Sequence, residues 1–303
     1  MRVSLIGQAA FGEAVFKRLT EEGIEIVGVS APAPGKRPDP LWAIAEESGL
    51  QPIDTKFLKE NEGIKKWQSL NSELGVMAFV TEFLPNEILE TPTKGTIQYH
   101  PSLLPLHRGS AAMNWPIIFG ETETGLTIFW PDEGMDTGPI LLQKTCPIKS
   151  TETLGSLYFD RLFPMGIDAM SEAIALVQAG KAPRIEQNHE LSTYEPPCGE
   201  THAKIQWHNP AQQVYAQIRG CNPQPGAWAT YKGSRIGIFD CEYTNTLEAG
   251  MPGSLLRVEE DGIVVRLNGG IIKIKRVQPE GERKLSATDW VTQAEIKPGG
   301  RFR

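Results

Sequence analysis

The stretch RVSLIGQAAFGEAVFKRLTEEGIEIVGVS (residues 2–30) decides the fold class, because it reads as a strand, a helix and a second strand in succession. Residues 2–7 are an apolar run typical of a buried strand, and residues 12–23 carry apolar side chains at helical spacing before a terminating glycine. Residues 25–30 predict the next strand. Strands that alternate with helices build doubly wound, mostly parallel sheets, so we expect an α/β fold of the Rossmann-like kind.

The pattern continues on the C-terminal side of this unit. The proline-rich residues 31–40 predict a loop, and residues 41–49 a helix. Further strands are expected at residues 75–83 and 95–100, and an antiparallel pair at residues 125–130 and 138–148 around a short loop. Residues 153–180 have the spacing of one long helix, which we expect to bend at Pro164.

The pattern of predicted elements changes at about residue 203. Four β-type runs separated by glycine-containing turns follow, at residues 226–233, 234–244, 253–267 and 269–277. Such short, evenly spaced strands predict a small barrel or sandwich. We therefore expect two domains, residues 1–202 and residues 203–303.

Charge and cysteine content narrow the class of protein. The net charge of -7 over 303 residues argues against a protein that coats nucleic acid without sequence preference. Residues 203–303 hold 14 Lys and Arg against 10 Asp and Glu, which makes that part mildly basic. The four cysteines show no CxxC pair and no histidine at zinc-ligand spacing, so we expect free thiols and no metal. Without a signal-peptide pattern or a long apolar run, a cytoplasmic protein without a membrane partner is predicted.

The glycine pattern GQAAFG (residues 7–12) is a weak signal for a nucleotide. It lacks the middle glycine of a dinucleotide fingerprint and the Lys-Ser/Thr of a P-loop, and no acidic residue ends the second strand. We interpret it as a tight turn between strand and helix, and we do not predict NAD(P).

Two other stretches carry candidate chemistry. In IQYHPSLLPLHRG (residues 97–109), His100 stands where a strand leaves the sheet, which is where open α/β sheets bind ligands. In WPDEGMDTGP (residues 130–139), a short loop holds three carboxylates, and Gly134 and Gly138 allow the backbone to approach a flat ligand closely. If Asp136 pairs with His100, the two suit attack on an acyl carbon, with general acid–base help worth about 10² to 10⁴ in rate. A solvated acidic loop is the alternative.

A Ser-His-Asp hydrolase is a competing scheme that the sequence disfavours. No G-x-S-x-G motif is present, and Ser102 lies only two residues beyond His100. We reject this scheme.

YHPSLLPLHRGSAAMNW (residues 99–115), with Asp136 in DEGMDTG following it, resembles the formyltransferase-type folate enzymes. These include methionyl-tRNA formyltransferase and the hydrolase domain of 10-formyltetrahydrofolate dehydrogenase. IQWHNPAQQVYAQIRGCNPQPGAW (residues 205–228) is similar to the start of their C-terminal domain, which implies an OB-like barrel. The resemblance implies that His100 is the catalytic histidine and Asp136 the essential acid. It also implies a folate site bordered by Glu82, Phe83 and Leu84 and by the loop that holds Asp132 and Gly134. Two interpretations of Arg108 remain. It contacts a substrate anion, which is the folate glutamate tail or a phosphate, or it is a solvated loop arginine.

One departure from the family pattern bears on the reaction. The transferases carry Asn-x-His at the end of this strand, whereas Gln98 stands here. A glutamine amide reaches about 1.5 Å farther out on a fixed backbone, and displacements of about 1 Å can cost as much as 10²-fold in rate. The hydrolase domain likewise lacks this asparagine, and several other stretches look closest to that domain. No counterpart of the dehydrogenase's aldehyde dehydrogenase module is present, so no NADP-dependent oxidation is expected.

These observations lead to one favoured function and two alternatives. The favoured function is hydrolysis of 10-formyltetrahydrofolate to tetrahydrofolate and formate, with catalytic roles for His100, Asp136 and Gln98. The second is transfer of the formyl group to an amine on methionyl-tRNA or an amino sugar, which the basic C-terminal part supports. The third is a folate-binding protein without catalysis.

Overall fold

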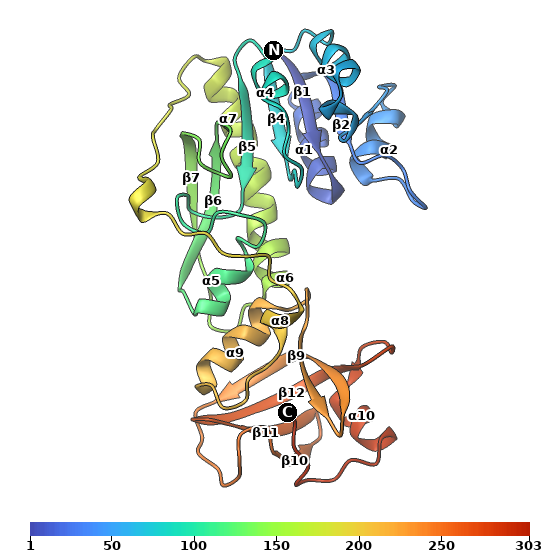
Figure 1. The fold of residues 1–303 in the computed structure, drawn as a ribbon, viewed down its shortest axis with the longest axis vertical. Helices are drawn as coiled ribbons and strands as arrows, with labels where there is room; N and C mark the ends of the chain where they lie inside the picture. The colour runs from blue at the N-terminus through green and yellow to red at the C-terminus, as the bar shows by residue number, and fades with distance from the viewer. The chain divides into compact units, whose positions relative to one another are not determined.

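The computed structural model describes residues 1–303, and the chain forms two compact units (Figure 1). The first unit comprises Met1–Ala112, Gly125–Cys146 and Asp160–Tyr194. The second comprises Met113–Thr124, Pro147–Phe159 and Glu195–Arg303. The domain boundary expected between residues 202 and 203 stays a prediction. None of the helices has the length and apolar character needed to cross a membrane.

The first unit is built on a seven-stranded sheet. Five strands are parallel to their neighbours and the sixth runs antiparallel to the fifth. The order is β3 (Ile53–Asp54), β2 (Glu25–Ala31), β1 (Arg2–Gly7), β4 (Leu74–Ala78), β5 (Thr96–His100), β6 (Glu123–Phe129) and β7 (Ile140–Pro147). The order reverses between β1 and β4, which confirms the doubly wound sheet.

Both faces of this sheet are covered by helices. Alternate side chains of a strand point to opposite faces, so one strand contributes to two buried clusters. On β1, Val3 and Leu5 belong to one buried cluster and Ile6 to another. The larger cluster takes in α1 (Ala9–Glu21), α2 (Pro40–Glu47) and α7 (Phe163–Gln178). The smaller one takes in η1 (Phe57–Lys59), α3 (Asn61–Gln68) and α4 (Asn86–Glu90). A short 3-10 helix, η3 (His189–Leu191), lies in the segment that follows α7.

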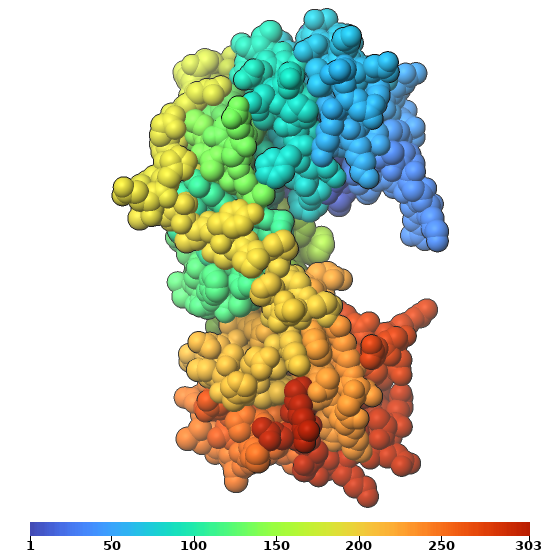
Figure 2. Space-filling view, viewed as in Figure 1, coloured from blue at the N-terminus to red at the C-terminus, as the bar shows by residue number.

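The turn after β1 is tight, as the glycine pattern predicts. A Cβ on Gly7 would lie 2.5 Å from the carbonyl oxygen of Ala78, so only glycine allows β1 and β4 to end this close together. The Asp39 carboxylate accepts hydrogen bonds from the backbone N–H groups of Ala9 (2.8 Å) and Leu41 (2.9 Å). One side chain at the end of the proline-rich loop therefore caps the first turns of both α1 and α2. The loop itself projects from the surface of the first unit (Figure 2).

Two expected elements differ from the structure. The strand predicted for residues 75–83 ends at Ala78, because Phe79 adopts a φ of 60° and turns the chain out of the sheet. The long helix predicted for residues 153–180 is divided into α6 (Leu154–Leu157), a π-helical turn η2 (Tyr158–Leu162) and α7. The break therefore lies before Pro164, and this proline occupies the first turn of α7, where a missing N–H costs nothing.

The second unit carries an antiparallel sheet of six strands. In sheet order they are β10 (Leu255–Glu259), β11 (Gly262–Leu267), β12 (Gly270–Pro279), β9 (Ser234–Thr244) and β8 (Ala227–Tyr231), with β13 (Leu285–Ser286) paired to β12. The C-terminal residues hydrogen-bond to both ends of this order: Thr230 and Arg303 exchange backbone bonds, and Leu255 N–H donates to Gly300. The tail thereby links the two edges of the sheet. The helices of this unit are α5 (Asn114–Phe119), α6, α8 (Glu200–Ala203), α9 (Ala211–Gly220) and α10 (Ala287–Gln293).

Candidate active site

His100 is the last residue of β5, at the carboxyl end of the parallel strands. Tyr99 points to the opposite face, where its ring packs against Phe11 in the larger cluster. That anchoring fixes which face His100 occupies. His100 is 5% exposed, so its ring lies inside the protein rather than in bulk water.

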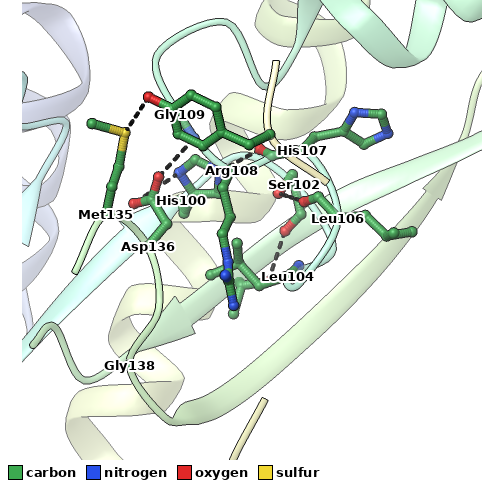
Figure 3. A network of polar contacts seen from close by, with 12 residues as sticks. His100, Ser102, Leu104, Leu106, His107, Arg108, Gly109, Met135, Asp136 and Gly138 are labelled. Carbon is green, nitrogen blue, oxygen red and sulfur yellow. Dashed lines mark hydrogen bonds and ion pairs between the residues drawn. The ribbon is translucent and has the colours of Figure 1, made fainter. Parts of the chain in front are cut away.

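His100 and Asp136, whose pairing the sequence leaves open, lie next to each other in the structure (Figure 3). His100 Nδ1 lies 3.5 Å from Asp136 Oδ1, and both side chains are at most 10% exposed. His100 Nε2 lies 2.9 Å from the carbonyl oxygen of His107. Because a carbonyl can only accept, Nε2 carries the proton of the neutral ring, and Nδ1 faces the carboxylate as a base. A separation of 3.5 Å is longer than that of a strong hydrogen bond.

The second oxygen of the Asp136 carboxylate, which does not face His100, is also bound by the protein. Oδ2 accepts a hydrogen bond of 2.8 Å from the backbone N–H of Gly109. Asp136 itself adopts a φ of 55°, a left-handed conformation that costs roughly 1–2 kcal/mol for a residue with a side chain. Strained backbone of this kind is typical of functional sites, where surrounding contacts maintain it.

The loop that follows His100 is fixed by polar contacts on two sides. Thr127 Oγ1 donates to the carbonyl of Ser102 (2.7 Å) and accepts from the N–H of Leu104 (3.1 Å). On the other side, the backbone N–H of His107 donates to Thr193 Oγ1 at 2.8 Å. The carbonyl that binds His100 is thereby part of a loop that is hydrogen-bonded on two sides.

The acidic loop between β6 and β7 is organised by its own residues. Asp132 Oδ1 accepts hydrogen bonds from Gly134 N–H (3.0 Å) and Thr137 Oγ1 (2.5 Å). A Cβ on Gly138 would lie 1.8 Å from the carbonyl oxygen of Trp130, so the base of the loop closes only with glycine there. Asp132 and Gly134 are exposed, and their predicted contact with substrate stays a prediction.

Gln98 projects from the same face of β5 as His100, since two residues separate them. Its side chain is half-buried. It makes no hydrogen bond to another protein group, which leaves its amide available to a ligand. Its catalytic role stays a prediction.

The segment after β4 carries the other predicted substrate residues. Phe83 is 60% exposed, while Leu84 packs against the smaller cluster. A hydrogen bond and the charge of Lys59, 2.5 Å away, lower the pKa of Glu82 below its usual range. Asn86 Nδ2 donates to Glu133 Oε1 at 2.8 Å, which ties this segment to the acidic loop. A cavity of about 150 Å³ opens beside it, at the ends of β1 and β4, lined in part by Gln8, Asp54, Lys56, Thr81 and Glu82.

Arg108 is buried rather than solvated, with 8% of its surface exposed. Its Nη2 lies 2.7 Å from Gln187 Oε1 and 3.0 Å from His189 Nδ1. Its predicted contact with substrate stays a prediction. The sequence gives no sign of Gln187, because a lone glutamine in a polar stretch carries no signal of the burial that the fold imposes.

The site is thus built around two adjacent titratable side chains, His100 and Asp136, at the end of β5. No group of three or more His, Cys, Asp or Glu side chains is arranged to hold a metal ion. A base at His100 Nδ1, a fixed carboxylate and a free amide can activate water or an amine and stabilise a tetrahedral oxyanion.

Comparison with known proteins gives two matching family models. Residues 1–174 match the model described as formyl transferase, and residues 199–295 match the formyl transferase C-terminal domain. The mitochondrial 10-formyltetrahydrofolate dehydrogenase of Mus musculus is 36% identical over 97% of this chain and 34% of its own length. The methionyl-tRNA formyltransferase of Desulforamulus reducens is 34% identical over 99% of this chain and 96% of its own length. The chain therefore spans about a third of the dehydrogenases that it matches.

Solved structures share the fold. HypX from Aquifex aeolicus in complex with tetrahydrofolic acid superposes with a TM-score of 0.73 at 18% identity, over 98% of this chain and 48% of that one. The N-formyltransferase from Helicobacter canadensis, in complex with folinic acid and dTDP-3-aminofucose, gives 0.68 at 17% identity, over 91% and 98%.

Proposed function

The chain belongs to the formyl transferase family, and from that premise we propose that it hydrolyses 10-formyltetrahydrofolate to tetrahydrofolate and formate. The observation that carries the proposal is the pair of His100 Nδ1 and Asp136 Oδ1, 3.5 Å apart at the end of β5. The pair stands ready for proton transfer at one edge, while the Gly109 N–H and the His107 carbonyl hold its other atoms.

The proposed reaction follows from these positions. The folate lies across the strand ends, bordered by residues 82–84, Asp132 and Gly134. Asp136 orients a water molecule that attacks the formyl carbon, and the proton of the water passes to His100 Nδ1. The imidazolium then stabilises the oxyanion and returns this proton to the folate nitrogen as the C–N bond breaks. The new C–O bond remains in formate, and Gln98 polarises the formyl oxygen.

Water is favoured over an amine as the acceptor on two grounds. Gln98 stands where the transferase pattern has an asparagine, and the hydrolase domain of 10-formyltetrahydrofolate dehydrogenase also lacks that asparagine. The cytosolic 10-formyltetrahydrofolate dehydrogenase of Homo sapiens is 40% identical over 75% of this chain, although this chain spans only 26% of that protein.

The test is turnover without any acceptor. Purified protein receives 10-formyltetrahydrofolate, and both products are followed over time. We expect many turnovers, with tetrahydrofolate and formate released in equal amounts. His100→Ala and Asp136→Ala should each lose at least about 10²-fold while keeping the fold, as removal of a general acid–base group predicts. Normal turnover by either variant would contradict the assignment.

Formyl transfer to an amine is the second candidate. The similarity to a methionyl-tRNA formyltransferase over nearly its full length favours it. Four basic side chains on the strands of the second unit form ion pairs, namely Arg257–Glu248, Lys273–Glu259, Lys275–Glu242 and Arg276–Asp240. The excess of basic over acidic residues in residues 203–303 remains beside these pairs. Release of tetrahydrofolate only after addition of methionyl-tRNA or an amino sugar would establish transfer, with steep salt dependence in the case of tRNA. Binding of folate with no turnover under either condition would indicate the third alternative.

A further inference from the structure

Arg108 is a buried cation whose hydrogen-bond partners are an amide and an imidazole rather than a carboxylate. Buried arginines are costly unless their charge is paired. Because a guanidinium only donates, Nδ1 of His189 is the acceptor in this contact. The burial of Arg108 against two neutral partners indicates that its hydrogen bonds position a neighbouring side chain.

Arg108 fixes the orientation of the Gln187 amide. Because a guanidinium only donates, the oxygen of Gln187 must face Arg108 and its nitrogen must face away. That nitrogen, Nε2, donates to the carbonyl oxygens of Asp136 (2.9 Å) and Gly138 (2.7 Å). Gln187 is 5% exposed, so these bonds form in a nearly dry environment, where each contributes more than it would in water.

The contacts close a ring around Asp136. The backbone N–H of Gly109, the residue next to Arg108, binds the Asp136 carboxylate. The side chain of Arg108 reaches the Asp136 backbone carbonyl through Gln187. Both ends of Asp136 are therefore held from one short segment of the loop that follows His100.

We propose that Arg108 and Gln187 are positioning residues that hold Asp136 in its left-handed conformation, with its carboxylate facing His100. The proposal rests on the proposed function, since the pair they align is the reacting pair. A misplacement of about 1 Å can cost as much as 10²-fold in rate, so release of this ring acts on the chemical step. Neither side chain needs to touch the substrate.

The experiment compares four variants with matched controls. Gln187→Met keeps the volume and removes all three hydrogen bonds, and Arg108→Met removes the donor to Gln187. Arg108→Lys is the conservative variant that keeps one donor, and Asp136→Asn serves as a reference. Gln278→Met and Arg276→Met are the controls, on strand β12 of the second unit. We measure kcat and KM for 10-formyltetrahydrofolate, thermal unfolding, and the NMR resonances of the histidine rings, of which the chain has 5.

We expect Gln187→Met and Arg108→Met to lower kcat by about 10- to 100-fold with KM within about twofold. Arg108→Lys should recover most of the loss. The His100 resonances should move in Gln187→Met in the same direction as in Asp136→Asn, and the controls should match the wild type.

Three outcomes are distinguishable from the expected one. A raised KM with unchanged kcat would overturn the proposal, because it would make Arg108 a substrate contact. Lower melting temperature with unmoved His100 resonances would also overturn it, in favour of a merely structural role. If the wild type shows no turnover but the resonances move as described, the positioning stands and the hydrolase assignment fails.

Discussion

At the scale of single residues, the site depends on which nitrogen of His100 is free. The His107 carbonyl occupies Nε2, so only Nδ1 can exchange a proton with a reacting group. His107 and Asp136, which flank the ring, both adopt positive φ, at 54° and 55°. Two residues in a disfavoured conformation on either side of one imidazole show that the backbone is shaped around the pair.

Gln98 gives the first prediction at this scale. Gln98→Asn withdraws the amide by about 1.5 Å, so the formyl oxygen loses its donor if the proposed contact exists. We expect kcat for hydrolysis to fall by about 10- to 100-fold, with folate binding retained. Gln98→Leu, which has no donor at all, is the control and should fall at least as far. Unchanged kcat in both variants would exclude Gln98 from the reaction.

At the scale of elements, the site lies where two loops meet. One leaves β5 and carries His107, Arg108 and Gly109; the other joins β6 to β7 and carries Asp136. The segment after α7 runs over the surface of the first unit (Figure 2) and supplies Gln187, which bonds to both loops. Three segments that are far apart in the sequence thus determine the position of Asp136 relative to His100.

Gly138 provides a prediction for these elements. In Gly138→Ala, the new Cβ would lie 1.8 Å from the Trp130 carbonyl oxygen, so the base of the loop must open. We expect a loss of about 1–3 kcal/mol in the free energy of unfolding, measured in urea, and a fall in kcat because Asp136 moves with the loop. Gly35→Ala is the control, since a Cβ there meets nothing within 4 Å. Equal stability of the two variants would show that the loop is not held closed at Gly138.

The sequence predicts where helices and strands lie better than it predicts the residues at which they end. It also indicates His100 and Asp136 more clearly than the residues that hold them in place. Apolar runs identify the strand that ends at His100 and the two strands that flank the loop of Asp136, because burial in a sheet requires such runs. The early end of β4 at Ala78 could not be predicted, since the apolar run continues through Phe79 while the backbone turns. Gln187 could not be predicted either, because its importance comes from two loops that only the folded chain brings together.

At the scale of the whole molecule, each unit has its own buried core. The larger cluster and the smaller cluster lie on the two faces of the first sheet, and a separate cluster fills the second unit. His100, Asp136, Arg108 and Gln187 all belong to the first unit. The chemistry proposed here therefore draws its protein groups from the first unit.

The most direct measurement of the central claim is the origin of the formate oxygens. The protein is supplied with 10-formyltetrahydrofolate in ¹⁸O-labelled water without an amine, and the formate is analysed by mass spectrometry. We predict that each formate carries one oxygen from the solvent, and that His100→Ala and Asp136→Asn form labelled formate no faster than the uncatalysed reaction. Absence of enzyme-dependent formate, with tetrahydrofolate released only when an amine is present, would contradict hydrolysis as the function.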